Sequence, residues 1–178
     1  MEEKFDVLNK FGEFTGKIAT REECHRRGLW HRAVYAFIID SNKNILLQKR
    51  SNNKKLWPNK WDVTVGGHVS SGEFGRQALI RETKEELGIN IDDNDIKYIV
   101  GSTSINKQGD IINKHYNECY LITKNVDISK MKIQKEEVSE VRYFSKDELL
   151  KRISNNYEGL TEKTGAWNFL EIILEKYI

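Results

Sequence analysis

The chain has 178 residues, of which 38% are hydrophobic and 10% aromatic, enough for one compact domain with a core but too few for a second large one. Its 29 basic residues nearly balance 27 acidic residues, so bulk charge gives no indication of a nucleic-acid or membrane partner. We therefore expect a single domain over residues 1–178 that acts on a small molecule, while nothing in the sequence predicts its oligomeric state.

Two cysteines, Cys24 and Cys119, stand far apart in the sequence and form no CxxC pair. A disulfide or a zinc site built from thiolates is therefore not expected, and both thiols are predicted to be reduced and partly buried. No apolar amino-terminal run and no stretch of transmembrane length is present. These features predict a cytoplasmic protein.

The first 30 residues are expected to form a hairpin and a connector in front of a core that spans residues 31–178. In Phe5–Ile18, apolar residues alternate with polar ones around a turn-prone segment, which is typical of a short hairpin. The polar segment Arg21–Arg32 then connects the hairpin to the core and carries two histidines.

Apolar strands begin the core. Ala33–Ile39 is apolar on both faces, as a buried strand is, and a polar turn leads from it to a return strand, Ile45–Arg50. The loop that follows is basic and aromatic and contains the only proline, Pro58. A third strand, Trp61–Val65, ends at a pair of glycines, so the next helix begins at a strand end, where ligands of α/β proteins commonly bind.

Capping residues set the limits of that helix. Gly88 is a typical helix stop because glycine adopts a left-handed conformation at little cost. Either Ser70 or Ser71 can cap the amino-terminal end. The sequence therefore predicts a helix from about Phe74 to Leu87.

Helical spacing divides this segment into an acidic and a packing side. Glu82, Glu85 and Glu86 fall together at i, i+3 and i+4, opposite Ile80 and Thr83. Adjacent carboxylates repel one another unless a cation neutralises them, and such oxygen ligands suit Mg²⁺ or Mn²⁺. A solvated helix face is the alternative, and it is the commoner role of charged helical residues. The glycines that frame the segment favour the metal site.

Small residues on the acidic side predict a close neighbour. Gly75 and Ala78 would let the backbone around Gly66 and Gly67 approach the helix, so that a carbonyl group can join the carboxylates. Arg81 can orient one carboxylate of the segment through a bidentate pair.

Further strands and two helices are expected after the acidic helix. Ile96–Ile105, Tyr116–Thr123 and Val138–Phe144 have strand-like patterns, and Ser145 with Glu148 forms a capping box for a following helix. The last helix carries an apolar stripe at helical spacing. Strands around a central helix, closed by an amphipathic helix, predict an α/β (α+β) fold with a mixed β-sheet between helices.

The segment from Gly67 to Ile89, GHVSSGEFGRQALIRETKEELGI, resembles the Nudix box, G-x5-E-x7-R-E-U-x-E-E-x-G-U. Only Thr83 departs, at a position where the family usually has an apolar residue. So many matches over so long a spacing make the resemblance specific. The residues that match are Gly67, Glu73, Arg81, Glu82, Glu85, Glu86, Gly88 and Ile89.

This resemblance implies the Nudix fold and a divalent-metal hydrolase. The metal ligands implied are the Gly67 carbonyl with Glu82, Glu85 and Glu86, while Glu73, Arg81 and Gly88 have structural roles in the motif. One box carboxylate is the expected base; Glu137 is the other candidate, because a loop glutamate near that point can serve as base or extra ligand in Nudix hydrolases.

The run from His25 to Glu86 is similar to the branch of the family that contains type I isopentenyl diphosphate isomerase and its hydrolase relatives. This similarity implies a possible second metal held by His25, His31, His68 and Glu118. From the residues alone His115 is also a candidate, and histidines in polar connectors are more often surface or hydrogen-bonded residues than ligands. The similarity further implies that Arg50 and Lys54 face the diphosphate.

The function expected is hydrolysis of a diphosphate linkage in a nucleoside diphosphate derivative or a similar small molecule, by attack of water on phosphorus with Mg²⁺ or Mn²⁺ as cofactor. The alternatives are an isomerase acting on an isoprenoid diphosphate and a non-catalytic ligand-binding Nudix module. The isomerases resembled here carry a cysteine directly before the glycine and histidine of the turn, where this chain has Gly66.

Overall fold

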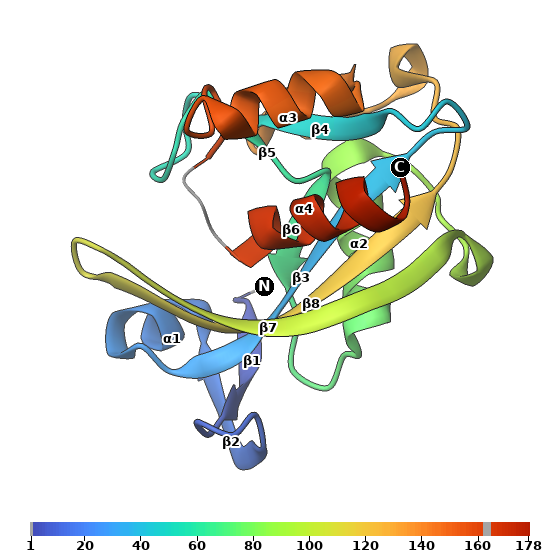
Figure 1. Cartoon of the computed structure of the whole chain (residues 1–178). Helices are drawn as coiled ribbons and strands as arrows, with labels where there is room; N and C mark the ends of the chain where they lie inside the picture. The colour runs from blue at the N-terminus through green and yellow to red at the C-terminus, as the bar shows by residue number, and fades with distance from the viewer. Residues whose placement is uncertain (1, 162–164) are drawn as a thin grey trace.

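Strand β3 (Trp30–Ile39) lies at the centre of the fold, where its two apolar faces predict it (Figure 1). The computed structural model describes residues 2–161 and 165–178. Within these ranges the other elements are β1 (Lys4–Leu8), β2 (Phe14–Thr20), α1 (Arg21–Arg27), β4 (Ile45–Arg50), β5 (Trp61–Asp62), β6 (Val65–His68), α2 (Gly75–Leu87), β7 (Ile96–Gln108), β8 (Ile111–Thr123), β9 (Val138–Phe144), α3 (Lys146–Ser154) and α4 (Gly165–Lys176), with single 3₁₀ turns at Asp93–Asp95 and Ile128–Lys130.

The sheet is mixed, as predicted. Strand β3 runs parallel to β8, from Trp30 opposite Lys114 to Ile39 opposite Thr123, and antiparallel to β6 on its other side. Its ends also pair with β1 and β4, and β4 in turn pairs with β5 and β9. Three strands that carry histidines, β3, β6 and β8, are thus adjacent.

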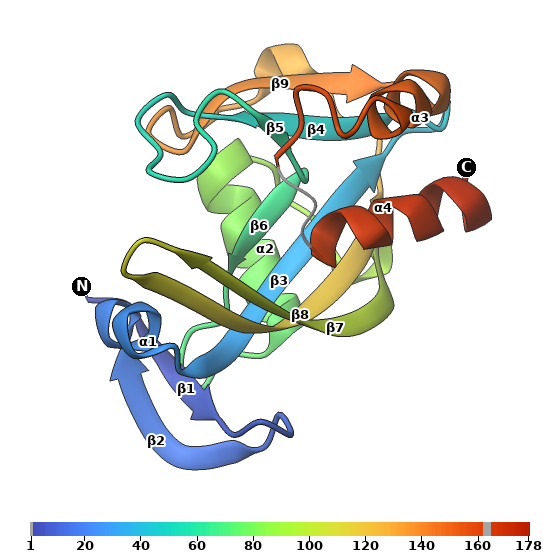
Figure 2. The same cartoon turned by 60° about the vertical axis from the view of Figure 1, so that its left-hand side comes forward.

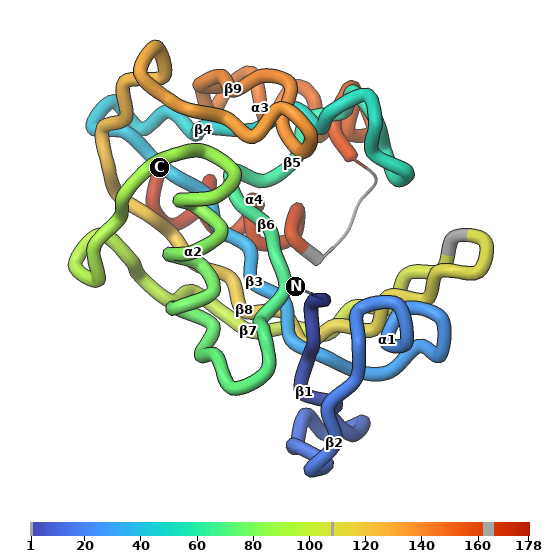
Figure 3. Tube along the Cα trace, turned by 180° about the vertical axis from the view of Figure 1, so that it is seen from behind, coloured from blue at the N-terminus to red at the C-terminus, as the bar shows by residue number. Residues whose placement is uncertain are grey.

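Helices α2 and α4 cover opposite faces of the sheet (Figures 1 and 2), and Figure 3 shows α2 in front when the molecule is seen from behind. The core under α4 includes Phe37, Trp167 and Leu170, and the core under α2 includes Ile38 and Leu79. Because neighbouring residues of β3 point to opposite faces, one strand contributes to both cores. The predicted sandwich of a mixed sheet between helices is confirmed.

The prediction of an irregular connector after the amino-terminal hairpin is wrong. The β1–β2 hairpin is present, but residues 21–27 form helix α1, whose N-cap Thr20 accepts a hydrogen bond from the Glu23 backbone N–H at 3.2 Å. Gly28 ends the helix with φ of 61°, in the left-handed region. Strand β3 then begins at Trp30, three residues earlier than expected.

The start of α2 also differs from the prediction. Its N-cap is Phe74, not Ser70 or Ser71, and the Gln77 side chain accepts a hydrogen bond from the Phe74 backbone N–H at 2.9 Å. Ser70 instead donates its own backbone N–H to Glu73 at 3.0 Å. The carboxyl end agrees with expectation, since Gly88 has φ of 69°.

The predicted strand Trp61–Val65 is divided into β5 and β6. The hydroxyl group of Thr64 accepts a hydrogen bond from the Ile38 backbone N–H at 2.9 Å and donates one to the Leu46 carbonyl. The Thr64 side chain thus bonds to β3 and β4 in place of the backbone hydrogen bonds of a continuous strand. The chain changes direction here, between β5 and β6.

Strands β7 and β8 extend further than predicted and form a long hairpin that projects beyond the central sheet (Figure 1). Half of the predicted capping box at α3 is present. Ser145 accepts from the Glu148 backbone N–H at 3.3 Å, but the Glu148 carboxylate pairs with Arg142 and Arg152.

The apolar stripe of the last helix is buried as predicted. Ala166, Phe169, Leu170, Ile173 and Leu174 pack into the core under α4. Both cysteines are free and buried. None of the helices in the described ranges has the length and apolarity needed to span a bilayer.

Candidate active site in the cleft between the sheet and helix α2

The carboxylates of α2 meet the end of strand β6, where the chain turns after Gly67 and His68. Glu82 and Glu86 point towards the sheet and are mostly buried, whereas the side chain of Glu85 is 54% exposed. A helical turn brings positions 82 and 86 to the same side, while position 85 lies at its solvent edge. The predicted acidic face is therefore partly buried instead of fully solvated.

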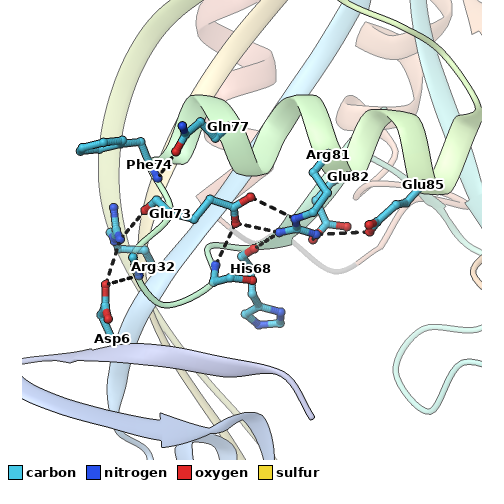
Figure 4. Close-up of polar contacts among 11 residues, drawn as sticks. Asp6, Arg32, His68, Glu73, Phe74, Gln77, Arg81, Glu82 and Glu85 are labelled. Atoms are coloured by element: carbon cyan, nitrogen blue, oxygen red, sulfur yellow. Dashed lines mark hydrogen bonds and ion pairs between the residues drawn. The ribbon is translucent and has the colours of Figure 1, made fainter. Parts of the chain in front are cut away.

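Arg81 holds this group together (Figure 4). Its guanidinium group donates to both carboxylate oxygens of Glu73, at 3.0 and 2.9 Å, which is the bidentate pair predicted. It also donates to Glu82 at 2.8 Å, to Glu85 at 3.2 Å and to the His68 carbonyl at 3.1 Å. One side chain thus fixes the strand end, the loop and the helix relative to one another.

Gly67 allows the close approach of strand and helix. A Cβ atom at this position would overlap the Glu82 carboxylate, so only glycine leaves this carboxylate beside the β6 backbone. Gly75 has a different role from the one expected. A Cβ atom there would overlap Glu118 on β8, and the space it leaves is occupied by that side chain, not by the backbone of residues 66–67.

Glu86 is 7% exposed and receives one hydrogen bond from a side chain, in which the Gln48 amide donates at 3.3 Å. Burial, followed by the nearby charges of Glu82 and Glu137, raises the pKa of Glu86 to about 8. Burial also raises the pKa of Glu82, against the opposing effect of Arg81. The surroundings of Glu82 and Glu86 thus disfavour their ionised forms.

The basic loop between β4 and β5 faces these carboxylates. Lys54 forms an ion pair with Glu137, which lies in the loop before β9. Arg50 donates to Asp62 at 3.0 Å and to the Leu56 carbonyl at 3.0 Å. The two basic residues expected at the diphosphate therefore line the same cleft as the acidic group, but each has a carboxylate partner.

A cleft of about 1290 Å³ joins these features. It extends from Arg50, Lys54 and Trp57 past the carboxylates to His25 and the amino-terminal segment. Its volume exceeds what a diphosphate alone requires, and the basic loop borders one end of it.

The four histidines of the chain converge at the other end of the cleft. One ring nitrogen from each of His25, His31, His68 and His115 lies within 4.8 Å of the others. The predicted convergence of the first three is confirmed, but Glu118 is not part of the cluster. Residues 115 and 118 point to opposite faces of β8, because side chains alternate along a strand, and Glu118 accepts a hydrogen bond from Tyr120 at 2.5 Å on the α2 side.

The NUDIX domain family matches residues 29–163 of the chain. The chain belongs to the Nudix family. Nudix hydrolase 3 of Arabidopsis thaliana is 38% identical over 152 residues, which cover 83% of this chain and 20% of that longer protein. An uncharacterized Nudix hydrolase of Listeria monocytogenes is 36% identical over 147 residues, which cover 83% of this chain and 82% of that protein. The chain is thus a Nudix hydrolase.

Two further likenesses bear on fold and branch. The crystal structure of DR0079 from Deinococcus radiodurans has a TM-score of 0.73 and 24% identity, and the match covers 99% of this Nudix hydrolase and 100% of that chain. An isopentenyl-diphosphate Delta-isomerase of Haloarcula marismortui is 42% identical over 62 residues, which cover 35% of this chain and 33% of that enzyme. The first shows the fold, and the second agrees with the branch suggested by the sequence.

Sequence reasoning missed Gln48 and Asp62. Both lie on short strands where single polar residues carry no motif, and their importance follows only from pairing, since Gln48 is opposite Asp62 in the β4–β5 register. Gln48 is a buried amide directly after the three apolar residues that begin β4, and that contrast is the one sequence signal that could have identified it.

Proposed function

We propose that this Nudix hydrolase requires Mg²⁺ or Mn²⁺ and cleaves a diphosphate linkage in a nucleoside diphosphate derivative or a similar small molecule, by attack of water on phosphorus. The observation that carries the proposal is the burial of Glu82 and Glu86 beside the glycine turn, at the floor of a cleft bordered by Arg50 and Lys54.

The donor set suits a hard divalent cation. The Gly67 carbonyl with Glu82, Glu85 and Glu86 offers only oxygen ligands, which Mg²⁺ and Mn²⁺ prefer. The raised pKa values of Glu82 and Glu86 support the same assignment, because a cation would offset the burial and the repulsion that disfavour their ionised forms. When bound, the metal would lower the pKa of a water molecule and neutralise charge on the diphosphate.

The chain's own residues orient the reaction. Arg81 fixes Glu82 and Glu85 by donating to both, and the Gln48 amide fixes Glu86. A buried carboxylate held in this way loses little freedom when it binds, which favours precise alignment. The base is a box carboxylate, Glu82 or Glu85, or else Glu137, which lies close enough to Glu86 to raise its pKa.

Basic and aromatic residues of the β4–β5 loop suit a substrate with a diphosphate and a ring. Arg50 and Lys54 line the cleft and can bind phosphate oxygens, for which lysine must exchange its partner Glu137. Trp57 lines the same part of the cleft and offers a surface on which a base can stack. Two free cysteines are in keeping with action in the cytoplasm.

The test is a screen of nucleoside diphosphates, nucleoside triphosphates, sugar nucleotides and cofactor diphosphates with Mg²⁺ or Mn²⁺, in which release of phosphate or nucleoside monophosphate is measured. Turnover that depends on the metal is expected for at least one class. Absence of turnover across the panel would favour the non-catalytic ligand-binding module. The intact set of box carboxylates argues against that alternative, because a module that only binds a ligand does not need them.

On the substrate so identified, Glu86→Gln should lower kcat by about 10²-fold or more while the fold is retained, because the amide keeps the shape but loses the charge that holds the metal. Glu82→Gln should behave in the same way. The matched control is Glu175→Gln on α4, an exposed residue on the other face of the sheet, which should leave kcat unchanged. Near wild-type turnover by a folded Glu86→Gln protein would contradict the assigned site.

A further inference from the structure

All four histidines of the sequence meet at one place, although they come from four separate elements: α1, β3, β6 and β8. The sheet register accounts for three of them. His31 is directly opposite His115 on the neighbouring parallel strand, and His68 pairs with Ala33 on the other side of β3. Helix α1 then places His25 over these three strands, with its ring centroid 5.3 Å from those of His31 and His68.

The rings offer unused nitrogen atoms to one another. The Nε2 atoms of all four histidines are buried and have no hydrogen-bond partner among the described residues. The His31 Nδ1 group lies 2.9 Å from the Leu29 carbonyl, to which it can only donate, so its Nε2 atom keeps a lone pair that faces the cluster. Buried polar atoms without partners are uncommon in native proteins and call for a ligand.

The cluster is closed on one side by an aromatic ring from the amino-terminal hairpin. Phe5 stacks on both His31 and His68, with centroid distances of 4.9 Å. An apolar lining of this kind excludes water from one side of the cluster.

We propose that His25, His31, His68 and His115 form an all-imidazole site for one transition-metal ion, with Zn²⁺ as the representative case, and that this ion fastens α1 to the central sheet. The site contains no carboxylate from the described residues, so imidazole-preferring metals are favoured over Mg²⁺. Four protein ligands complete a tetrahedral shell, which is typical of structural zinc sites. The site is separate from the box carboxylates and does not rest on the proposed hydrolysis.

The local packing explains why a fastening ion would matter. Helix α1 has only seven residues and buries one of them, Cys24, in a small cluster with Phe5, Val7 and Ala19 that is separate from the two main cores. So short a helix gains little from its own hydrogen bonds. Binding energy from a metal ligand on α1 would therefore appear as resistance of this helix to opening.

The first test is metal content. The full chain is stripped of metal, mixed with Zn²⁺ or Co²⁺ in the presence of excess Mg²⁺, and desalted. The wild type should retain one equivalent of Zn²⁺, and bound Co²⁺ should show the intense visible bands of a tetrahedral ion. His25→Gln and His115→Gln should lose this binding, whereas Glu118→Gln and Glu86→Gln should keep it.

Glu118→Gln is the variant that separates this site from the set with Glu118 that the sequence similarity implied. Loss of Zn²⁺ in Glu118→Gln with retention in His115→Gln would overturn the assignment of His115, and retention of less than half an equivalent by the wild type would overturn the site. His25 is only partly buried and lies on a short surface helix, so we expect His25→Gln to fold even where the buried His115→Gln does not.

The second test measures the fastening itself, with Cys24 as the reporter and Cys119 as the internal reference. Cys24 is the buried residue of α1 itself, and Cys119 lies in the core under α4. Zn²⁺ should slow alkylation of Cys24 by iodoacetamide by about tenfold or more in the wild type and not in His25→Gln, because alkylation requires local opening of α1. Alkylation of Cys119 should not respond. Equal rates for Cys24 with and without Zn²⁺ would overturn the structural role.

Discussion

Arg81 illustrates how much of the site depends on the geometry of one side chain. Its planar guanidinium group reaches two oxygens of Glu73 and, in other directions, Glu82, Glu85 and the His68 carbonyl. A lysine offers a single ammonium group, which cannot satisfy a bidentate pair and orient a second carboxylate at the same time. The positive charge alone is therefore not sufficient for the role of this residue.

We expect Arg81→Lys to lower kcat/KM by about tenfold or more on the substrate identified by screening, because the ligand carboxylates lose their fixed orientation. The measurement is steady-state kinetics with matched thermal unfolding. Arg76→Lys is the control, since Arg76 lies on the same helix but pairs with the exposed Asp93. A fully active Arg81→Lys protein would show that orientation by Arg81 is unnecessary.

At the residue scale, the sequence predicted which residues form the site better than it predicted which residues they contact. The box carboxylates, Arg81 with its bidentate pair, and three of the converging histidines are where the pattern indicated. The sequence did not decide between His115 and Glu118 as the fourth member, because the register of β8 relative to β3 depends on strand pairing. A shift of the register by one residue moves every side chain of a strand to the other face of the sheet. The sequence predicted that Lys54 faces the substrate but not that it pairs with Glu137, because the two residues are 83 positions apart in the chain.

At the element scale, helix α1 was missed although its terminal signals are present. Thr20 and Glu23 have the spacing of a capping box, acidic residues occupy the first turn, and Gly28 ends the helix. What is absent is an apolar stripe, since Cys24 is the one buried residue of the helix. The hydrophobic period that reveals longer helices therefore gives no signal for this one.

Thr83 is the one position where the box of this chain departs from the family pattern, and α2 shows how the helix accommodates it. Thr83 is fully buried, and its hydroxyl group donates to the Leu79 carbonyl at 2.7 Å. That carbonyl also accepts the regular helical hydrogen bond one turn later. The hydroxyl group is thus satisfied within the helix and has no contact with the carboxylates on the other side.

Thr83→Val should therefore change the melting temperature by less than about 4 °C, because the backbone carbonyl keeps its helical partner and a methyl group fills the space of the hydroxyl group. Turnover should stay within about twofold of the wild type, as expected for a substitution away from the site. Thermal unfolding and kinetics on the same preparation measure both. A tenfold loss of turnover without loss of stability would mean that this position affects the carboxylates through the helix.

At the scale of the whole molecule, the sheet connects the cleft to the opposite core. The indole N–H of Trp167 on α4 donates to Thr161 at 2.9 Å, and Thr161 donates to Asp62 at 3.3 Å, which in turn accepts from Arg50. The sequence predicted α4 and the sheet from apolar patterns, and it predicted α2 from its terminal glycine and the helical spacing of its side chains. It could not predict this polar connection, because its members are brought together only by the folded sheet.

The alternative isomerase depends on a thiol, and the fold shows how this chain lacks one in the cleft. Gly66 lies on β6 opposite Tyr35 and has no side chain. A Cβ atom there would lie 3.2 Å from the Tyr35 ring, so there is little space for a larger residue at this position. Cys119 pairs with Tyr35 in register but is buried in the core under α4, and Cys24 is on the buried side of α1. Neither thiol is among the described residues that line the cleft.

We therefore predict no isomerisation of isopentenyl diphosphate to dimethylallyl diphosphate. Moving a proton to and from carbon requires a proton-transferring group on each side of the allylic unit, and the backbone of Gly66 supplies none on one side. The protein would be incubated with isopentenyl diphosphate, Mg²⁺ and Zn²⁺, and dimethylallyl diphosphate would be followed by chromatography against a metal-only control. Glu86→Gln serves as a second control, because hydrolysis of the substrate by the box site could mask a slow isomerisation. Catalytic conversion above the metal-only control, by either protein, would replace the hydrolase with the isomerase as the better account of this cleft.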